Sequence, residues 1–203
     1  MDSALHSVLL DWQGKHIQER IAMELKAAYS EPHRRYHTLQ HIEFCLRELG
    51  RHDTHAVHLN EVRWALLFHD AIYDPRRNDN EARSADWACR VMQELQRSEE
   101  EIARVRKLIM ATVHAAQAET QDEALLLDID LSILGADAAA FDDYDRTIRV
   151  EYEWVPEQAY RFARAAVLQG FLKRDRIFQT AVYEEREAIA RSNIERVLER
   201  LRS

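Results

Sequence analysis

Residues 60–72, NEVRWALLFHDAI, combine a helical hydrophobic pattern with two polar side chains in its apolar part. Apolar side chains recur here every three to four residues, and His69 falls on the same side as Leu66, as on one face of an α-helix. An aspartate in such surroundings, here Asp70, is costly to bury unless it is paired or bound to a metal ion. The stretch therefore predicts a buried helix that carries a polar site.

The same helical spacing recurs along most of the remaining chain, and no segment alternates convincingly at period two. Glycine (4 residues) and proline (3 residues) are scarce, and each proline falls where a helical pattern breaks. Helices are expected at about 5–28, 36–49, 60–72, 78–96, 98–113, 125–135, 138–152, 157–172 and 178–201. The sequence predicts an all-α fold, a single bundle of about eight to ten helices over residues 1–203. Its motif-bearing core is expected at about 29–135, with C-terminal helices at 138–203 packed on it.

Local signals set the expected ends of several helices. Asn78 followed by Glu81, and Ser98 followed by Glu101, are capping-box patterns that each open a helix. Gly50 is expected just past the end of the helix that precedes it.

Charge and composition exclude several classes of partner. The net charge of −8 argues against a nucleic-acid polymer as ligand, because phosphate backbones need a basic surface, but a single basic pocket allows a small phosphorylated substrate. No apolar run approaches the ~18 residues of a membrane span, and the N-terminus lacks the features of a signal peptide. Cys45 and Cys89 are too few for a disulfide framework and are expected as buried, reduced thiols. The sequence predicts a cytoplasmic protein without a membrane partner, and it leaves a homo-oligomer open.

Two further stretches place metal-capable side chains among apolar neighbours, YHTLQHI at 36–42 and DIDLS at 128–132. His37 and His41 are four residues apart, so on a helix they share one face. Asp130 is the better ligand candidate of the second stretch; Asp128 points away from it, which suits an N-cap or a partner that orients a ligand histidine. Imidazole and carboxylate together suit Mn, Fe, Co, Ni, Zn or a partly hydrated Mg. The sequence therefore predicts a site for one or two divalent metal ions.

The order of these motifs resembles that of the HD superfamily of metal-dependent phosphohydrolases. A bacterial group of predicted HD phosphohydrolases is similar to this chain in the strings YHTLQHI at 36–42, HDAIYDP at 69–75, NE at 80–81, SA at 84–85 and DIDLSILG at 128–135. Tyr36-His37 with His41, Phe68-His69-Asp70 and Asp130-Leu131-Ser132 also resemble motifs of the cyclic-nucleotide phosphodiesterase branch. The resemblance covers about residues 29–135 by motif, and the C-terminal third only by helical character.

This resemblance implies an HD-type helical bundle with a metal centre. The ligands that it implies are His41, His69, Asp70 and Asp130. It makes His37 the acid that protonates the leaving oxygen, but in plainer members the first histidine is itself a ligand, so the roles of His37 and His41 remain exchangeable. The phosphodiesterase branch carries a further histidine where this chain has Tyr73, so cyclic-nucleotide specificity is not implied.

Motifs and resemblance together predict a hydrolase of a small phosphomonoester, phosphodiester or nucleotide. A bound divalent ion activates water for such a reaction, and Asp70 is expected to bridge two ions or to accept a proton from that water. One alternative is a di-iron oxygenase of HD type, which needs His114 and His37 as further ligands. Another is a non-catalytic module for ligand binding or regulation that keeps its metal for folding.

Five weaker candidates each have a structural alternative. His114 either joins a second metal or complements a helix C-terminus, and Glu81 either faces the pocket or only closes the capping box. Asp74 either lines the mouth of the site or starts a turn. Arg76 and Arg77 either clamp a substrate phosphate at that mouth or belong to a solvated loop.

Overall fold

The computed structural model of the chain describes residues 15–113 and 117–202. Within these residues it contains nine α-helices, three short 3-10 helices and no β-strand, which confirms the all-α prediction. The α-helices are α2 (Lys15–Ala28), α3 (Leu39–Arg51), α4 (Leu59–Phe68), α5 (Asn80–Glu94), α6 (Glu99–Ala111), α7 (Gln121–Asp130), α8 (Ala138–Glu151), α9 (Glu157–Leu172) and α10 (Glu184–Arg202). The 3-10 helices are η1 (Asp53–His55), η2 (Leu131–Gly135) and η3 (Ala181–Tyr183).

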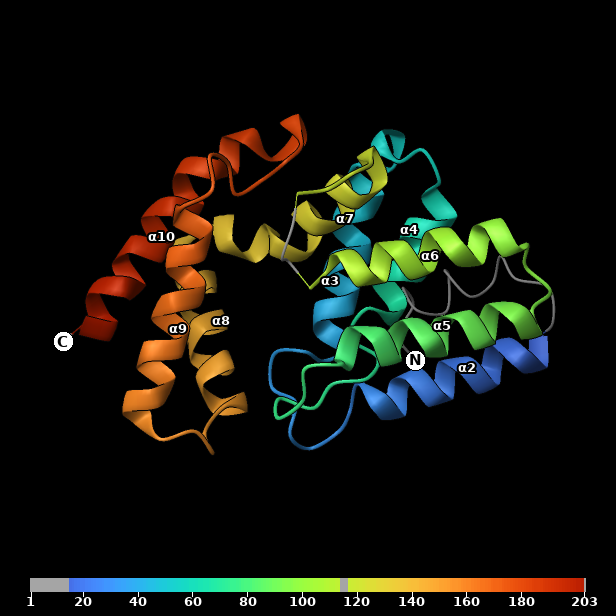
Figure 1. The fold of residues 1–203 in the computed structure, drawn as a ribbon, viewed down its shortest axis with the longest axis horizontal. Helices are drawn as coiled ribbons and strands as arrows, with labels where there is room; N and C mark the ends of the chain where they lie inside the picture. Colours follow the sequence, from blue (N-terminus) through green and yellow to red (C-terminus); the bar gives the residue numbers. More distant parts are fainter. Residues whose placement is uncertain (1–14, 114–116, 203) are drawn as a thin grey trace.

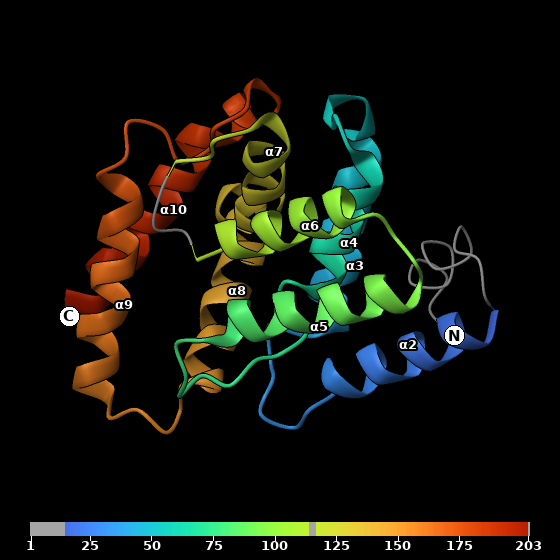
Figure 2. The ribbon, with the colours of Figure 1, turned by 45° about the vertical axis from the view of Figure 1, so that its right-hand side comes forward.

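Helix α7 lies between two groups of helices (Figures 1 and 2). On one side it contacts α3, α4 and α6, and α5 packs along α6. On the other side η2, which continues directly from α7, contacts α8 and α10, and α9 packs against α10. The loop after α2, the loop before α5 and the connection between α8 and α9 all lie at the lower end of both views. Residues from these three segments line one cavity.

Helix α7 is buried on nearly every side. Leu125, Leu126 and Ile129 are fully buried, and Leu127 is nearly so. Because these apolar side chains point to different sides of the helix, other elements have to enclose it. Asp130, at the C-terminal end of α7, is thereby carried into the interior of the protein.

Helix α4 ends at Phe68, and not at residue 72 as the sequence predicts. His69 caps the helix, and the N–H of Ala71 closes a turn onto the carbonyl of Phe68. The buried guanidinium of Arg34 donates to the carbonyl oxygens of Asp70 and Ala71 at 2.7 and 3.0 Å. The predicted helix end is wrong because a side chain distant in sequence occupies the carbonyls of this segment and fixes it as a turn.

Helix α3 begins at Leu39, so His37 precedes the helix and does not lie on it. The backbone N–H groups of residues 35, 36 and 37 donate to Oε1 of Glu151 at 2.7, 2.8 and 3.0 Å. These bonds hold the segment in an irregular conformation, because one carboxylate oxygen gathers three consecutive donors. The predicted helix start at residue 36 is wrong, and so is the argument that His37 and His41 share a helix face.

The ends of α6, α8 and α9 follow their sequence signals. Ser98 and Glu101 form the predicted capping box: Oγ of Ser98 accepts from the Glu101 N–H, and Oε2 of Glu101 accepts from the Ser98 N–H. Helices α8 and α9 begin at Ala138 and Glu157, as predicted. Local propensity therefore decides these ends.

Two predicted ends are wrong for local reasons. Helix α5 begins at Asn80, so Asn78 and Glu81 do not form a capping box. The amide side chain of Asn80 instead accepts from the N–H of Asp74 and donates to its carbonyl, at 3.1 and 2.9 Å. Gly50 lies inside α3, which continues to Arg51.

Helix α10 begins at Glu184, later than the predicted residue 178. The backbone N–H groups of residues 177 and 178 donate to Glu187, and those of residues 179 and 180 donate to Asp128. Since carboxylates take all four donors, this segment stays irregular, and only the C-terminal end of the predicted helix is right.

Candidate metal centre

Side chains from three separate segments bring nitrogen and oxygen atoms together near the C-terminal end of α7. Nε2 of His41 lies 3.1 Å from Oδ1 of Asp130 and 3.3 Å from Nε2 of His69. Oδ2 of Asp70 lies 3.0 Å from Nε2 of His69 and 3.7 Å from Nε2 of His41. The four predicted ligands therefore converge, and of the two exchangeable histidines the structure places His41 in this cluster.

The spacing of these atoms fits a coordination sphere. With metal–ligand distances of ~2.1 Å, neighbouring ligand atoms are about 3.0 Å apart in octahedral and about 3.4 Å apart in tetrahedral geometry. The contacts in the cluster run from 3.0 to 3.7 Å and bracket both values. One nitrogen or oxygen atom each of His41, His69 and Asp130 lie mutually within 4.8 Å. Asp70 is not part of this group of three, but its Oδ2 contacts both histidines.

His69 presents Nε2 to the cluster because its other ring nitrogen is occupied. Nδ1 lies 2.9 Å from the carbonyl oxygen of Leu66, which only accepts, so Nδ1 carries the hydrogen. In the neutral ring the lone pair is therefore on Nε2, which faces Asp70 and Asp130. A backbone carbonyl behind the ring is the usual support of a metal-binding histidine, so the donor set fits a divalent ion.

The two carboxylates make the cluster attractive to a cation. Burial alone would lower the pKa of His69, but the charges of Asp70 and Asp130 outweigh burial and raise this pKa well above its usual value. Burial would raise the pKa of Asp70, but the nearby His69 and His37 outweigh it and lower this pKa. These two shifts favour an imidazolium–carboxylate pair between His69 and Asp70, and a divalent ion that bound there would compete with the imidazolium proton.

Cys45 packs against the His41 ring, with Sγ 3.7 Å from Nε2. Burial, and then the negative charges of Asp130 and Asp70, raise the pKa of this thiol well above its usual value. Cys45 is therefore a neutral thiol packed against the His41 ring, and it is not part of the group formed by His41, His69 and Asp130. It is free and buried, as is Cys89, in agreement with the prediction from sequence.

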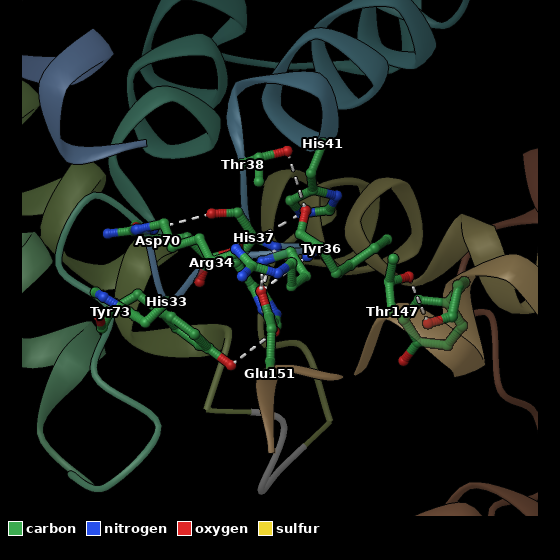
Figure 3. A network of polar contacts seen from close by, with 12 residues as sticks. His33, Arg34, Tyr36, His37, Thr38, His41, Asp70, Tyr73, Thr147 and Glu151 are labelled. Carbon is green, nitrogen blue, oxygen red and sulfur yellow. Dashed lines mark hydrogen bonds and ion pairs between the residues drawn. The ribbon is translucent and has the colours of Figure 1, made fainter. Parts of the chain in front are cut away.

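His37 lies beside the cluster and is held by Glu151 (Figure 3). Nδ1 of His37 lies 2.7 Å from Oε2 of Glu151, whose side chain is fully buried. Burial would raise the pKa of Glu151, but its hydrogen bonds with His37 and with three backbone N–H groups lower this pKa to about 2. Glu151 is therefore an anion at any ordinary pH, and it fixes the hydrogen of His37 on Nδ1.

The pKa of His37 is raised, although its burial acts in the opposite direction, because Asp70 and Glu151 are both close. The ring of Tyr73 stacks on that of His37 with 4.3 Å between centroids, and its hydroxyl donates to Oε2 of Glu151 at 3.0 Å. A histidine restrained on one nitrogen and stacked on one face keeps Nε2 available for proton transfer.

Arg34 ties the His37 segment to the turn that carries Asp70. Its guanidinium is almost fully buried and donates to the carbonyl oxygens of His37, Asp70 and Ala71 at 3.1, 2.7 and 3.0 Å. Nε of Arg34 also pairs with Glu31. The relative position of the two segments therefore depends on one side chain.

Glu151 and Arg34 are the site residues that sequence reasoning missed. Glu151 lies at the end of a predicted helix, 114 residues from His37 in the chain, and no local pattern connects the two. Arg34 lies in a connector with other basic residues, and nothing in the sequence distinguishes it from them. In the sequence Tyr73 is only a departure from the phosphodiesterase motif, whereas the structure stacks it against His37.

Asp128 does not orient a ligand histidine, and that interpretation is wrong. Its carboxylate accepts from the N–H of Gln179 and from the N–H and hydroxyl of Thr180, at 2.7, 2.7 and 2.6 Å. The prediction that Asp128 and Asp130 point to different sides of α7 is right. Asp128 faces the segment before α10 and anchors it through these hydrogen bonds.

Arg76 and Arg77, the two arginines predicted as a phosphate clamp, have different surroundings in the loop before α5. Oδ1 of Asp74 accepts from the N–H of Arg76 at 3.0 Å, so Asp74 forms the turn and also lines the cavity noted above. Arg77 pairs with Asp79 at the exposed surface, at 2.6 Å. The guanidinium of Arg76 lies over the Trp154 ring, 5.0 Å from its centroid, and lines the cavity.

The two remaining candidates stay without a role. Glu81 is half-buried in the first turn of α5 and takes no part in a capping box. His114 lies outside the described residues.

Comparison of the chain with family models, with curated proteins and with solved structures finds no match. Fold and site thus define an all-helical protein with a buried histidine–aspartate cluster. Membership of the HD superfamily stays a prediction from the motifs.

In the part of the chain that the structure describes, no helix is both long and apolar enough to cross a lipid bilayer.

Proposed function

We propose that the protein is a divalent-metal-dependent phosphohydrolase of HD type that acts on a small phosphomonoester, phosphodiester or nucleotide. The observation that carries the proposal is the convergence of His41, His69, Asp70 and Asp130, with contacts of 3.0 to 3.7 Å, beside a carboxylate-supported His37. Three segments distant in sequence supply these groups, and burying two imidazoles against two carboxylates is costly unless a cation compensates them.

The cluster residues would hold one or two divalent ions. A bound ion supplies Lewis acidity toward a phosphoryl oxygen and lowers the pKa of water from ~15.7 toward ~7. Asp70 and Asp130 keep 19% and 13% of their side chains exposed, so water and substrate would have access to an ion held by these four residues. Asp70 would accept a proton from the attacking water.

His37 would act as the general acid. Glu151 holds Nδ1 and raises the pKa of His37, so the imidazolium persists toward neutral pH and can donate the Nε2 proton to a leaving oxygen. Glu151 does not take up this proton, because its own pKa is about 2. Its role is to position the ring and to stabilise the charged form.

The test is metal analysis of the purified protein, followed by a panel of phosphomonoesters, phosphodiesters and nucleotides with Mn, Mg, Co and Ni. We expect Asp70→Ala to lose both metal and turnover, and His37→Ala to retain metal while kcat falls by about 10²- to 10⁴-fold. If Asp70→Ala keeps the metal content and activity of the wild type, the proposal is wrong.

Assays on the same purified protein distinguish the two alternatives, a di-iron oxygenase and a non-catalytic module. A di-iron oxygenase would take up oxygen after reconstitution with iron and release no phosphate. A non-catalytic module would bind metal and turn over no substrate of the panel. We place the protein in the cytoplasm, a proposal supported by its two unpaired buried cysteines.

A further inference from the structure

A cavity of about 590 Å³ lies beside the His37–Glu151 pair. Tyr73 and Glu151 line it, and both also contact His37. Its volume falls within the roughly 300–1,000 Å³ of small-molecule sites, well above what one phosphate group fills. The cavity therefore begins one side chain away from the proposed proton donor.

Three arginines from three segments line this cavity: Arg35 in the loop after α2, Arg76 in the loop before α5, and Arg83 in α5. Among the described residues, none of the three has a carboxylate oxygen within 4.0 Å of its guanidinium. Arg77, next to Arg76, is by contrast paired with Asp79. Nη1 of Arg35 also donates to the carbonyl oxygens of Pro32 and Arg34. Asp79 lies close enough to Arg83 for that arginine to lower its pKa. Three guanidinium groups at one cavity without a direct carboxylate partner, in a chain of net charge −8, still favour an anionic ligand.

The carboxylates that also line the cavity are mostly committed elsewhere. Glu31 pairs with the buried Arg34 at 3.0 Å, and Glu151 is occupied by His37 and backbone donors. Asp74 accepts the backbone N–H of its own turn. That bond leaves Asp74 with its negative charge, and Glu153 is exposed, so these two acids oppose the three arginines only in part.

Trp154 restrains Arg76, one of the three arginines, through a cation–π contact. Its ring is 46% exposed, and the guanidinium of Arg76 lies 5.0 Å from its centroid. A cation–π contact of this kind restrains the arginine while leaving its N–H groups free to donate. Arg76 is thereby oriented before a ligand arrives.

We propose that this cavity binds a second, non-reacting anionic group of the substrate, so that the preferred substrate carries at least two phosphate groups. The reacting phosphate would lie at the metal cluster and the second one among Arg35, Arg76 and Arg83. The substrate role rests on the proposed phosphohydrolase function. The anion site itself rests only on the cavity and its arginines.

Binding is tested apart from catalysis, by calorimetric titration of inorganic pyrophosphate into EDTA-treated protein. We expect the double variant R76Q/R83Q to bind about tenfold more weakly or worse, because two charge-assisted contacts are lost. The matched control R77Q/R90Q removes two exposed charges from the same loop and helix and should bind within about twofold of wild type. Glu153→Gln should bind more tightly. Equal affinity of wild type and R76Q/R83Q, or no binding by wild type, would overturn the anion site.

Kinetics with metal then test the substrate role, using p-nitrophenyl phosphate and a nucleoside diphosphate as substrates with one and two phosphate groups. R76Q/R83Q should raise KM for the diphosphate about tenfold, with kcat unchanged, and leave p-nitrophenyl phosphate hydrolysis unaffected. An unchanged KM for the diphosphate overturns the substrate role and leaves the phosphohydrolase proposal standing. Absence of hydrolysis by wild type overturns that proposal and the substrate role together, while the pyrophosphate titration still decides the anion site.

Discussion

Replacing Glu151 with glutamine tests the support of His37 with little change of shape. The Oε1 atom of the new side chain can still accept from the N–H groups of residues 35, 36 and 37. Its amino group, however, meets Nδ1 of His37 and the hydroxyl of Tyr73, both of which donate to Glu151 in the wild type. The substitution therefore replaces two charge-assisted bonds by donor–donor conflicts and removes the charge that favours the imidazolium.

The effect on stability follows from the pKa of Glu151. The difference between its usual value of 4.5 and about 2 in the folded protein corresponds to roughly 3 kcal/mol of folding free energy. The folded-state pKa is depressed, so this contribution is fully present above pH ~4.5 and is lost as pH falls from there through about 2. Urea denaturation at pH 6, where His37 holds its proton, should show the variant about 3 kcal/mol less stable, with a smaller difference at pH 3.

Activity should fall as well, because the pKa of His37 drops and its ring loses its anchor. We expect kcat to decrease by about 10²-fold, with metal content retained. Glu153→Gln is the matched control: two residues away and exposed, it should change stability by no more than about 0.5 kcal/mol. Equal stability of Glu151→Gln and wild type at pH 6, together with equal kcat, would refute the reasoning.

Three further substitutions separate positioning from metal binding. Arg34→Met should cost about 3 kcal/mol of unfolding free energy in urea melts and lower kcat, since three buried or partly buried carbonyl oxygens lose their donor; unchanged kcat would contradict its positioning role. Asp128→Ala should cost about 2–4 kcal/mol yet keep full metal content by elemental analysis, and loss of metal would contradict its assignment to the α10 segment. Ser98→Ala should cost about 1 kcal/mol through the lost cap of α6 and leave turnover unaffected; a change in kcat would connect α6 to the site.

The helices were predictable where local signals act alone. Ser98 opens α6 through its own capping box, and α8 and α9 begin where the hydrophobic pattern resumes. The start of α3 and the end of α4 were not predictable. Glu151 and Arg34, which lie far away in the chain, form hydrogen bonds with the backbone groups at these two helix ends. Sequence periodicity continues through these segments, and only the folded structure reveals the competing hydrogen bonds.

The candidate ligands were predictable because polar groups stand out in apolar surroundings. His69 and Asp70 follow a buried apolar run, and Asp130 follows the leucines of α7. Their supports carry no such signal, since a glutamate at a helix end, such as Glu151, is commonplace. The role of Asp128 was misassigned for a related reason: its partners, residues 179 and 180, come from a segment that was predicted as helix.

The central claim is that His41, His69, Asp70 and Asp130 bind a divalent cation. The most direct measurement is a calorimetric Mn²⁺ titration of EDTA-treated wild type, Asp130→Ala and Asp128→Ala, followed by elemental analysis after dialysis. The account predicts at least one bound ion in wild type and in Asp128→Ala, and no retained ion in Asp130→Ala. Binding should also release a proton, because the pKa of His69 is raised in the absence of metal. Undiminished Mn²⁺ binding by Asp130→Ala, or none by wild type, would contradict it.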